Sequence, residues 1–190
     1  MKPEESQKLM QKILDGRLYR HCLGVAEAAE TLACRFGADP GRAYVAGMVH
    51  DYGKRYSFQE LINKAAELKL SLDRVTIREC KLLHAPVGAA LVELELGITD
   101  PGIIKAVASH TTGRPGMTLL EKIIYLADYI EAGRRYEGVE KIRGAAINDL
   151  DGALLIAVNH ALNSVIARGL LMHPCSVTFR NSLLVDISGR

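Results

Sequence analysis

The sequence predicts an all-helical fold. Apolar residues recur at three- and four-residue steps through most of the chain, as on the buried face of a helix. The period-two alternation that is typical of strands is almost absent. The composition, 48% hydrophobic and 24% charged, is that of a globular protein. A disordered, fibrous or repeat protein is therefore excluded.

Start and stop signals divide the chain into helices. Asp39-Pro40 and Asp100-Pro101 each place an N-cap residue before a first-turn proline, and Ser57 to Glu60 and Thr118 to Glu121 match the capping box. Glycines typical of C-terminal caps follow the helical stretches at positions 37, 53, 97, 113 and 133. The helices expected from these signals are 4–14, 18–35, 40–51, 57–69, 74–82, 85–96, 101–110, 118–131, 139–145 and 149–168.

The length of the chain predicts a single domain. A chain of 190 residues can bury about 70% of its unfolded surface. The expected domain spans 1–190, with its core at about 18–170. The segment from His173 onward has the least regular pattern, and we expect it to be an irregular tail.

The net charge limits the kinds of partner that the protein can bind, and the cysteine pattern indicates its cellular compartment. The formal net charge is only +2, and Lys and Arg are spread along the chain, so no footprint for nucleic acid or a lipid surface is present. A small anion is the expected partner. No apolar run approaches the length of a membrane span. The cysteines lack CxxC spacing and a secretory context, which indicates a reduced, cytoplasmic protein; they are Cys22, Cys34, Cys80 and Cys175.

Five titratable residues fall on apolar helix faces. Asp128 lies among inward positions of its helix, and the histidines that share this property are His21, His50, His84 and His110. An ionised carboxylate in apolar surroundings costs several kcal/mol unless a cation or donors compensate it. A transition metal bound by imidazole and carboxylate would satisfy Asp128 and the inward histidines together.

His50 and Asp51 need a helix end between them. Adjacent helical residues point about 100° apart and cannot face one site from a regular helix. Gly53 supplies such an end. His50 can then project from the last turn while Asp51 turns inward and offers two oxygens, enough to bridge two ions.

Structural roles compete with these interpretations. A single inward histidine is more often a hydrogen-bonded core residue than a ligand, and Asp128 could instead form a salt bridge with an arginine of another helix. His160 shares an apolar stripe in the same way, and we favour a structural role for it. His173, next to Pro174, is expected in a loop.

The order of these residues resembles that of the HD-domain metal phosphohydrolase superfamily. The segments RHCLGVAEAA, AGMVHDYGK, LLHAPVGAALV, SHTTGRPGMTLLEKIIYLADYIEAGR and DLDGALLIAV look like the bacterial symmetrical bis(5'-nucleosyl)-tetraphosphatases. The resemblance covers nearly everything from Leu18 to Gly169, and Ser109 to Arg134 is its most specific part. Ala85 stands where glycine is expected in many relatives.

The resemblance implies an HD-domain helical bundle that holds a divalent transition metal. Iron is the expected metal, with manganese, cobalt, nickel or zinc as alternatives, and one or two ions are compatible with the residues. The implied metal ligands are His21, His50, Asp51 and Asp128. The implied catalytic residues are Asp51, His84 and His110, where the two histidines either face the phosphate chain or complete a second metal site.

The implied reaction is symmetrical hydrolysis of diadenosine tetraphosphate to two ADP by a metal-activated water. A substrate with several negative charges calls for basic groups near the metal. Arg114 is a weaker candidate, because its loop can point away from the cleft. The residues expected to contact substrate are Leu18, Arg20, Lys54, Arg55, His84, His110, Arg134, Thr178 and Arg180.

Two other functions remain open. An HD-type nucleotidase or phosphodiesterase would keep the metal and act on another nucleotide, and the segment SHTTGRPGM argues against it. A nucleotide sensor without turnover would be indicated by missing ligands, and none is missing. A homodimer is compatible with the helical pattern, although no apolar helix face in the sequence identifies a dimer interface.

Overall fold

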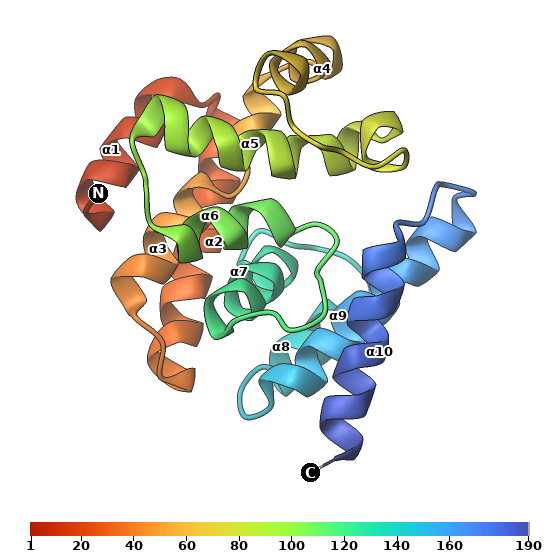
Figure 1. Cartoon of the computed structure of the whole chain (residues 1–190). Coiled ribbons are helices and arrows are strands. Elements are labelled where there is room, and N and C mark those ends of the chain that lie inside the picture. Colours follow the sequence, from red (N-terminus) through yellow and green to blue (C-terminus); the bar gives the residue numbers. More distant parts are fainter. Residues whose placement is uncertain (190) are drawn as a thin grey trace.

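The helices begin where the sequence places capping residues. In the computed structural model, which describes residues 1–189, the Asp39 side chain accepts from a backbone N–H in the first turn of its helix. Both expected capping boxes also form. No strand occurs in this range. The elements in Figure 1 are α1 (Pro3–Ile13), α2 (Gly16–Phe36), α3 (Pro40–Val49), η1 (Tyr52–Arg55), α4 (Phe58–Glu67), η2 (Thr76–Arg78), α5 (Cys80–Leu96), α6 (Pro101–Ser109), α7 (Leu119–Ile130), α8 (Val139–Ala145), α9 (Leu150–Ala167) and α10 (Pro174–Ser188), of which η1 and η2 are 3₁₀ helices.

Five helices pack together at the centre of the fold. α2 packs most extensively on α3 and also lies against α7, while α6 contacts α3, α5 and α7. One hydrophobic cluster extends from Met10 in α1 to Leu183 in α10. Figure 1 shows α8, α9 and α10 on the opposite side of α7 from α1. The helices α2, α3, α5, α6 and α7 therefore converge, and their ends can contribute to one site.

The helix boundary that the sequence predicted before Pro86 is absent from the structure. The sequence predicted two helices, over 74–82 and 85–96, but the structure has η2 followed by one continuous helix with Pro86 inside it. Proline lacks an N–H, so one helical hydrogen bond is lost. Leu83, Val87 and Leu91 are buried on this helix, and their packing outweighs that loss. His84 consequently lies in the second turn of α5 rather than at a helix start.

The C-terminal segment is a helix and not the irregular tail that the sequence predicted. His173 caps it by accepting from the Cys175 N–H at 3.1 Å, and Pro174 occupies the first turn. Phe179 and Leu183, one turn apart, are its buried residues, and α10 packs along α9. Two buried positions give too thin an apolar pattern for the sequence to indicate this helix.

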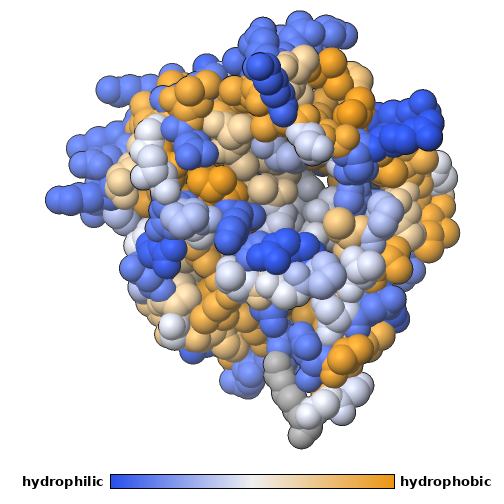
Figure 2. Space-filling view, in the orientation of Figure 1, coloured by the Kyte–Doolittle hydropathy of each residue, from blue (hydrophilic) through white to orange (hydrophobic). Residues whose placement is uncertain are grey.

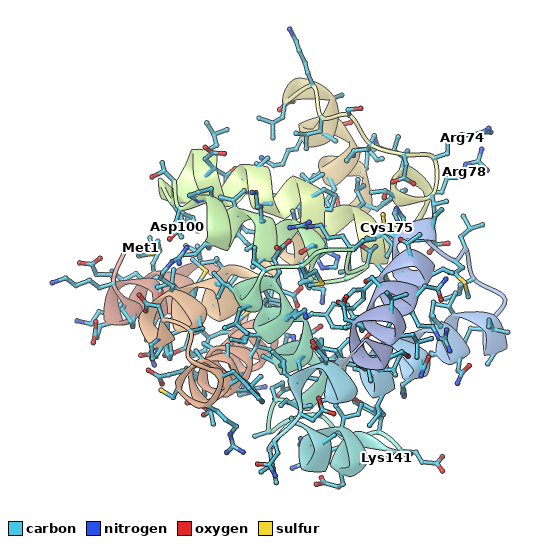
Figure 3. The ribbon with its side chains drawn as sticks, turned by 60° about the horizontal axis from the view of Figure 1, so that its bottom comes forward. Met1, Arg74, Arg78, Asp100, Lys141 and Cys175 are labelled. Carbon is cyan, nitrogen blue, oxygen red and sulfur yellow. The ribbon has the colours of Figure 1, made fainter. Side chains whose placement is uncertain are left out.

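The start of α10 is tied to the segment before α5. Nε2 of His173 lies 2.9 Å from Oδ2 of Asp73. Figure 3 shows Arg74 and Arg78 projecting outward on the same side of the molecule as Cys175. This contact joins two segments far apart in the sequence, and it gives His173 a capping role where a loop position was expected.

α9 is long and apolar enough to cross a membrane by length and composition alone. A core helix of a globular protein meets the same criteria. In the structure α9 contacts α7, α8 and α10, with Leu154, Ala157 and Val158 fully buried. On the face drawn in Figure 2, hydrophilic and hydrophobic residues are intermixed. We therefore interpret α9 as a core helix.

Candidate metal and active site

The structure brings six titratable side chains together as the sequence predicts. Four are buried, and the remaining two, His21 and Asp128, have side chains that are 18% and 15% exposed. The six are His21 of α2, His50 and Asp51 at the end of α3, His84 of α5, His110 at the end of α6 and Asp128 of α7.

Asp51 is the centre of this group. Its Oδ1 lies 3.1 Å from His84 Nε2 and 3.3 Å from His110 Nε2. Its Oδ2 lies 3.4 Å from His21 Nε2 and 3.3 Å from His50 Nε2. Each carboxylate oxygen thus faces its own pair of imidazoles, and two groups of potential metal ligands share Asp51.

The end of α3 allows two adjacent residues to face the same site. His50 keeps helical backbone angles, whereas Asp51 leaves the helix with φ −99° and ψ 16°, and η1 follows. A Cβ placed on Gly53 would lie 2.3 Å from the His84 carbonyl oxygen. Glycine at this position therefore lets η1 approach α5 closely enough to bring Asp51 beside His84.

His50 and His110 are oriented by carbonyls of their own helices. His50 Nδ1 lies 2.7 Å from the Gly47 oxygen, and His110 Nδ1 lies 2.7 Å from the Val107 oxygen. A carbonyl oxygen only accepts hydrogen bonds, so Nδ1 carries the proton in both rings. In the neutral rings Nε2 then presents a lone pair toward Asp51, as a metal ligand requires.

Asp128 has two partners. Its Oδ1 lies 3.0 Å from His21 Nε2. Arg134 donates to the same carboxylate, and its Nε donates to the Asp128 carbonyl oxygen at 2.6 Å. The arginine that the sequence offered as an alternative partner is thus present, but it follows α7 rather than coming from another helix.

The donor set fits a divalent metal ion. His21 Nε2, His50 Nε2 and Asp51 Oδ1 are buried and have no hydrogen-bond partner. Leaving buried polar atoms unsatisfied costs about 1–3 kcal/mol each. Imidazole nitrogens and carboxylate oxygens are ligands of first-row transition metals. A bound cation of this type would therefore provide a partner for each of the three buried atoms.

The surroundings shift the pKa values of the clustered groups in different directions. Burial lowers the pKa of the His84 imidazole to about 4 despite the nearby Asp51 carboxylate. Burial also acts to lower the pKa of His21, but the Asp128 and Asp51 carboxylates outweigh it and raise that pKa to about 9. For Asp51, burial acts to raise the pKa, yet the surrounding histidines hold it well below its usual range. The metal-free site therefore contains a charged Asp51, a neutral His84 and a protonated His21, and a cation that binds at His21 Nε2 displaces a proton from it.

A cleft of about 540 Å³ opens over the site, within the size range of small-molecule pockets. Of the predicted substrate contacts, His84, His110, Lys54 and Arg134 line it, and Asp128 does as well. Lys54 Nζ lies 2.6 Å from Asp51 Oδ2. The lining also contains two cations that the sequence did not single out, Lys81 and Arg168. Its positive charge suits an anionic ligand.

Five predicted substrate contacts do not line this cleft: Leu18, Arg20, Arg55, Thr178 and Arg180. The Arg55 guanidinium lies 5.1 Å from the Tyr52 ring centroid and donates to its hydroxyl. Arg180 donates to Asn159 Oδ1 at 2.7 Å. The Thr178 hydroxyl donates to backbone carbonyls in its own helix. Arg20 is exposed, and Leu18 packs on the core.

Arg114 also points elsewhere. It donates through Nε and Nη2 to the two carboxylate oxygens of Glu121, each at 2.7 Å. The loop after His110 is thereby held against the start of α7, which agrees with the expectation that this arginine can face away from the cleft.

Four cleft residues were not predicted to contact substrate. The cleft is also lined by Tyr129, Tyr136, His160 and His173. The ring centroids of Tyr136 and His160 lie 4.5 Å apart, with the rings edge to face. The apolar stripe of His160 was the available signal, but it is the same as that of a core histidine. No local pattern marks Tyr136, because it lies in the segment between α7 and α8.

Comparisons with known proteins agree with this geometry. The HD domain model matches residues 18–133. A Halalkalibacterium halodurans protein named symmetrical bis(5'-nucleosyl)-tetraphosphatase is 40% identical over 179 residues, which are 94% of this chain and 95% of that protein. A Bacillus subtilis protein of the same name is 41% identical over 162 residues, which are 85% of this chain and 87% of that one.

A solved structure has the same fold. The crystal structure of a Clostridium acetobutylicum protein, described as a predicted HD superfamily hydrolase involved in NAD metabolism, matches with a TM-score of 0.91 and 37% identity. The match covers 96% of this chain and 97% of that one. Fold and sequence similarity therefore extend well beyond the segment that carries the clustered histidines.

Proposed function

The chain belongs to the HD domain family, and we propose that it hydrolyses dinucleoside tetraphosphates symmetrically, with diadenosine tetraphosphate giving two ADP. The names of the two bacterial relatives support this substrate and this bond. One observation supports a phosphohydrolase most directly: two groups of potential metal ligands share Asp51 beside a cleft that four cations line.

Iron is the divalent metal that we propose, with His21, His50, Asp51 and Asp128 as its ligands. When bound, such a cation makes water a stronger nucleophile near neutral pH and offsets negative charge on phosphoryl oxygens. His84 and His110 either contact the phosphate chain or hold a second ion with Asp51. The two arrangements differ in the number of metal ions per chain, which metal analysis measures.

The basic residues of the cleft would bind the phosphate chain. Lys54 and Arg134 already contact Asp51 and Asp128, so a polyphosphate entering the cleft meets them beside the metal ligands. Charge-assisted hydrogen bonds from these groups would fix the phosphates. Lys81 and Arg168 extend the positive lining.

The two histidines beside Asp51 would hold a proton at the cleft. His84 Nε2 and His110 Nε2 lie 3.1 Å apart. Because His110 Nδ1 donates to the Val107 carbonyl, its Nε2 is the acceptor in this contact and His84 Nε2 is the donor. Because burial keeps His84 neutral, this N–H would donate a hydrogen bond to a phosphate oxygen and orient the phosphate chain, without transferring the proton.

We also propose a reducing, cytoplasmic setting. All four cysteines are free in the structure, and Cys22 is buried. Burial raises the pKa of the Cys22 thiol well above its usual value, which makes it unreactive. Free thiols are typical of compartments where cellular reductants keep cysteine reduced.

The first experiment combines metal analysis with product analysis. We would purify the protein anaerobically, quantify bound metal and incubate it with diadenosine tetraphosphate, resolving ADP, AMP and ATP by chromatography. We expect ADP as the sole product. His50→Ala and Asp128→Ala should lower metal content and reduce activity by more than about 100-fold, since even residues that only orient ligands contribute 10- to 100-fold. Asp186→Ala removes an exposed carboxylate and should change neither quantity.

Other products or no turnover would point to different functions. AMP plus ATP would contradict symmetrical cleavage. Metal binding without turnover of this substrate would favour another nucleotide or a sensor, and a panel of nucleoside mono-, di- and triphosphates would separate the two. Full activity in metal-free protein would contradict the assigned ligands.

A further inference from the structure

His21 is held differently from His50 and His110. His50 and His110 bond to carbonyls of their own helices, three residues earlier. His21 Nδ1 instead lies 3.3 Å from Oε1 of Glu131, which is 110 positions later in the chain. Glu131 follows α7 and comes three residues after Asp128. The ring of His21 therefore depends on a carboxylate from another element.

Local hydrogen bonds hold Glu131 in place. It is 6% exposed, and it caps the C-terminus of α7 through a 2.9 Å bond from its N–H to the Ala127 oxygen. The Gly133 N–H donates to its Oε2. One carboxylate oxygen is thus bound by the backbone while the other faces His21.

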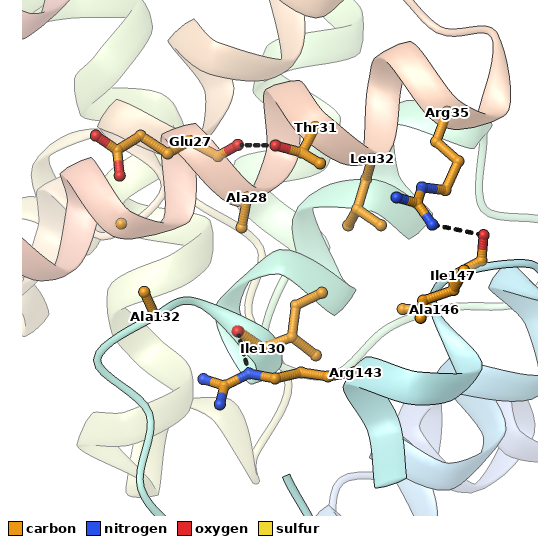
Figure 4. A pocket seen from close by; sticks show the side chains of 11 residues that line it. Glu27, Ala28, Thr31, Leu32, Arg35, Ile130, Ala132, Arg143, Ala146 and Ile147 are labelled. Atoms are coloured by element: carbon orange, nitrogen blue, oxygen red, sulfur yellow. Dashed lines mark hydrogen bonds between the residues drawn. The ribbon is translucent and has the colours of Figure 1, made fainter. Parts of the chain in front are cut away.

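Arg143 of α8 fixes the backbone around Glu131. Its Nε donates to the Ile130 oxygen at 3.0 Å, and its Nη2 donates to the Glu131 oxygen at 2.7 Å and the Arg134 oxygen at 3.3 Å. Figure 4 shows Arg143 reaching the end of α7 at Ile130. Three carbonyls of the segment that carries Glu131 are therefore bound by one guanidinium.

Two glycines leave room for the carboxylate. A Cβ on Gly24 would lie 2.8 Å from Glu131 Oε2, and a Cβ on Gly133 would lie 2.9 Å from the same atom. Contacts this short require the carboxylate to move. Gly24 lies one turn after His21 on α2 and hence on the same helix face, so α2 presents both the imidazole and the space for its partner.

We propose that Glu131 is a positioning residue that orients His21 for metal binding, and that Gly24 and Gly133 keep its carboxylate within reach of the ring. An ionised carboxylate accepts and does not donate, so it keeps the proton on His21 Nδ1, and a cation that binds at Nε2 displaces only the proton there. Carboxylates that bond the distal nitrogen of a metal-binding histidine fix its orientation and raise its basicity. This inference rests on the metal site of the proposed function and is independent of its substrate.

The test measures metal affinity without any nucleotide. Metal-free Glu131→Gln, which keeps the shape of the side chain and removes its charge, would be titrated with Co²⁺ and followed by visible absorption. We expect the Kd for Co²⁺ to rise by about 10- to 100-fold. Glu27→Gln removes the same charge from an exposed position on α2, and its Kd should equal that of the wild type.

A second variant displaces the carboxylate while keeping it in the chain. Gly24→Ala places a Cβ against Glu131 and should weaken Co²⁺ binding in the same direction. In the Zn²⁺-loaded wild type, ¹⁵N NMR should show a protected Nδ1–H on His21, and this proton should exchange faster in both variants. If Glu131→Gln does not fold, Gly24→Ala decides the question.

A lower melting temperature with an unchanged Kd would overturn the proposal, because a residue that only caps α7 would give that result. Wild-type Co²⁺ affinity in either folded variant would overturn it as well. Since no nucleotide is present, failure of diadenosine tetraphosphate hydrolysis would leave this result unaffected.

Discussion

The ends of α3 and α6 hold their site residues differently from the end of α7. His50 and His110 each stand at a helix C-terminus and bond to a carbonyl one turn earlier. Asp128 and Glu131 at the end of α7 face His21 of α2, and Arg143 of α8 binds the carbonyls that follow Asp128. The first arrangement is local, and the second requires three helices to be correctly packed.

This difference predicts which distant changes reach the site. A histidine bonded within its own helix keeps its orientation as long as that helix is intact. The ring of His21 also depends on the packing of α2 and α8 against α7. Substitutions in α8 should therefore alter the site through α7, and substitutions near η1 should alter it through Asp51.

The largest effect is expected where η1 passes α5. Gly53→Ala would place a Cβ 2.3 Å from the His84 carbonyl oxygen, so the backbone near Asp51 must shift. Overpacking of this kind costs typically about 1–3 kcal/mol of unfolding free energy, and more in rigid sites. Urea denaturation would measure the loss, and metal analysis should show reduced binding.

A glycine in an open position is the control for Gly53. A Cβ on Gly144 in α8 would meet nothing within 4 Å, so Gly144→Ala should stabilise the protein by about 0.5–1 kcal/mol through backbone entropy. If both variants had the same unfolding free energy, the close approach of η1 and α5 would not be what requires glycine at position 53.

A smaller effect is expected at the end of α7. Arg143→Ala removes donors from three carbonyls and should lower the unfolding free energy by about 1–3 kcal/mol. It should also weaken Co²⁺ binding, because the segment that positions Glu131 and Arg134 is loosened. Arg35→Ala is the matched control, because Arg35 and Arg143 line one pocket (Figure 4) and Arg35 donates to a single carbonyl, that of Ile147. Unchanged Co²⁺ affinity in Arg143→Ala would contradict the dependence of His21 on this segment.

The same difference explains what the sequence could predict. Helix periodicity and capping residues are local, and they correctly indicated the inward histidines and the helix end after His50. Glu131 and Arg143 act across the fold through carbonyls and a glycine-lined space, for which single-sequence patterns carry no signal. α10 was missed for a related reason, because it buries only two residues. Arg55 was expected at the cleft because it follows His50-Asp51, and Arg180 was expected to contact substrate from the tail, but their partners Tyr52 and Asn159 do not line the cleft.

The smallest effect concerns Glu121, which connects the two regions. It is fully buried and accepts from Ser109 at the end of α6, from Arg114 in the loop and from Thr118 before α7. Burial acts to raise its pKa, but Arg114 and Thr118 outweigh this and lower it. The stabilisation is thus present above its unfolded value of 4.5 and is lost as the pH falls through the lower folded value.

Glu121→Gln should therefore lower the unfolding free energy at neutral pH by about 1–2 kcal/mol, toward the lower end for a charged hydrogen-bonding group because Arg114 is partly exposed. Urea denaturation from pH 7 down to about pH 3 should show the difference from wild type shrinking below the unfolded pKa. Glu60 forms the same capping box with Ser57 on the exposed α4, and Glu60→Gln should give a much smaller difference with the same pH trend. A difference for Glu121→Gln that persists in acid would mean that packing of the side chain, rather than its charge, joins α6 to α7.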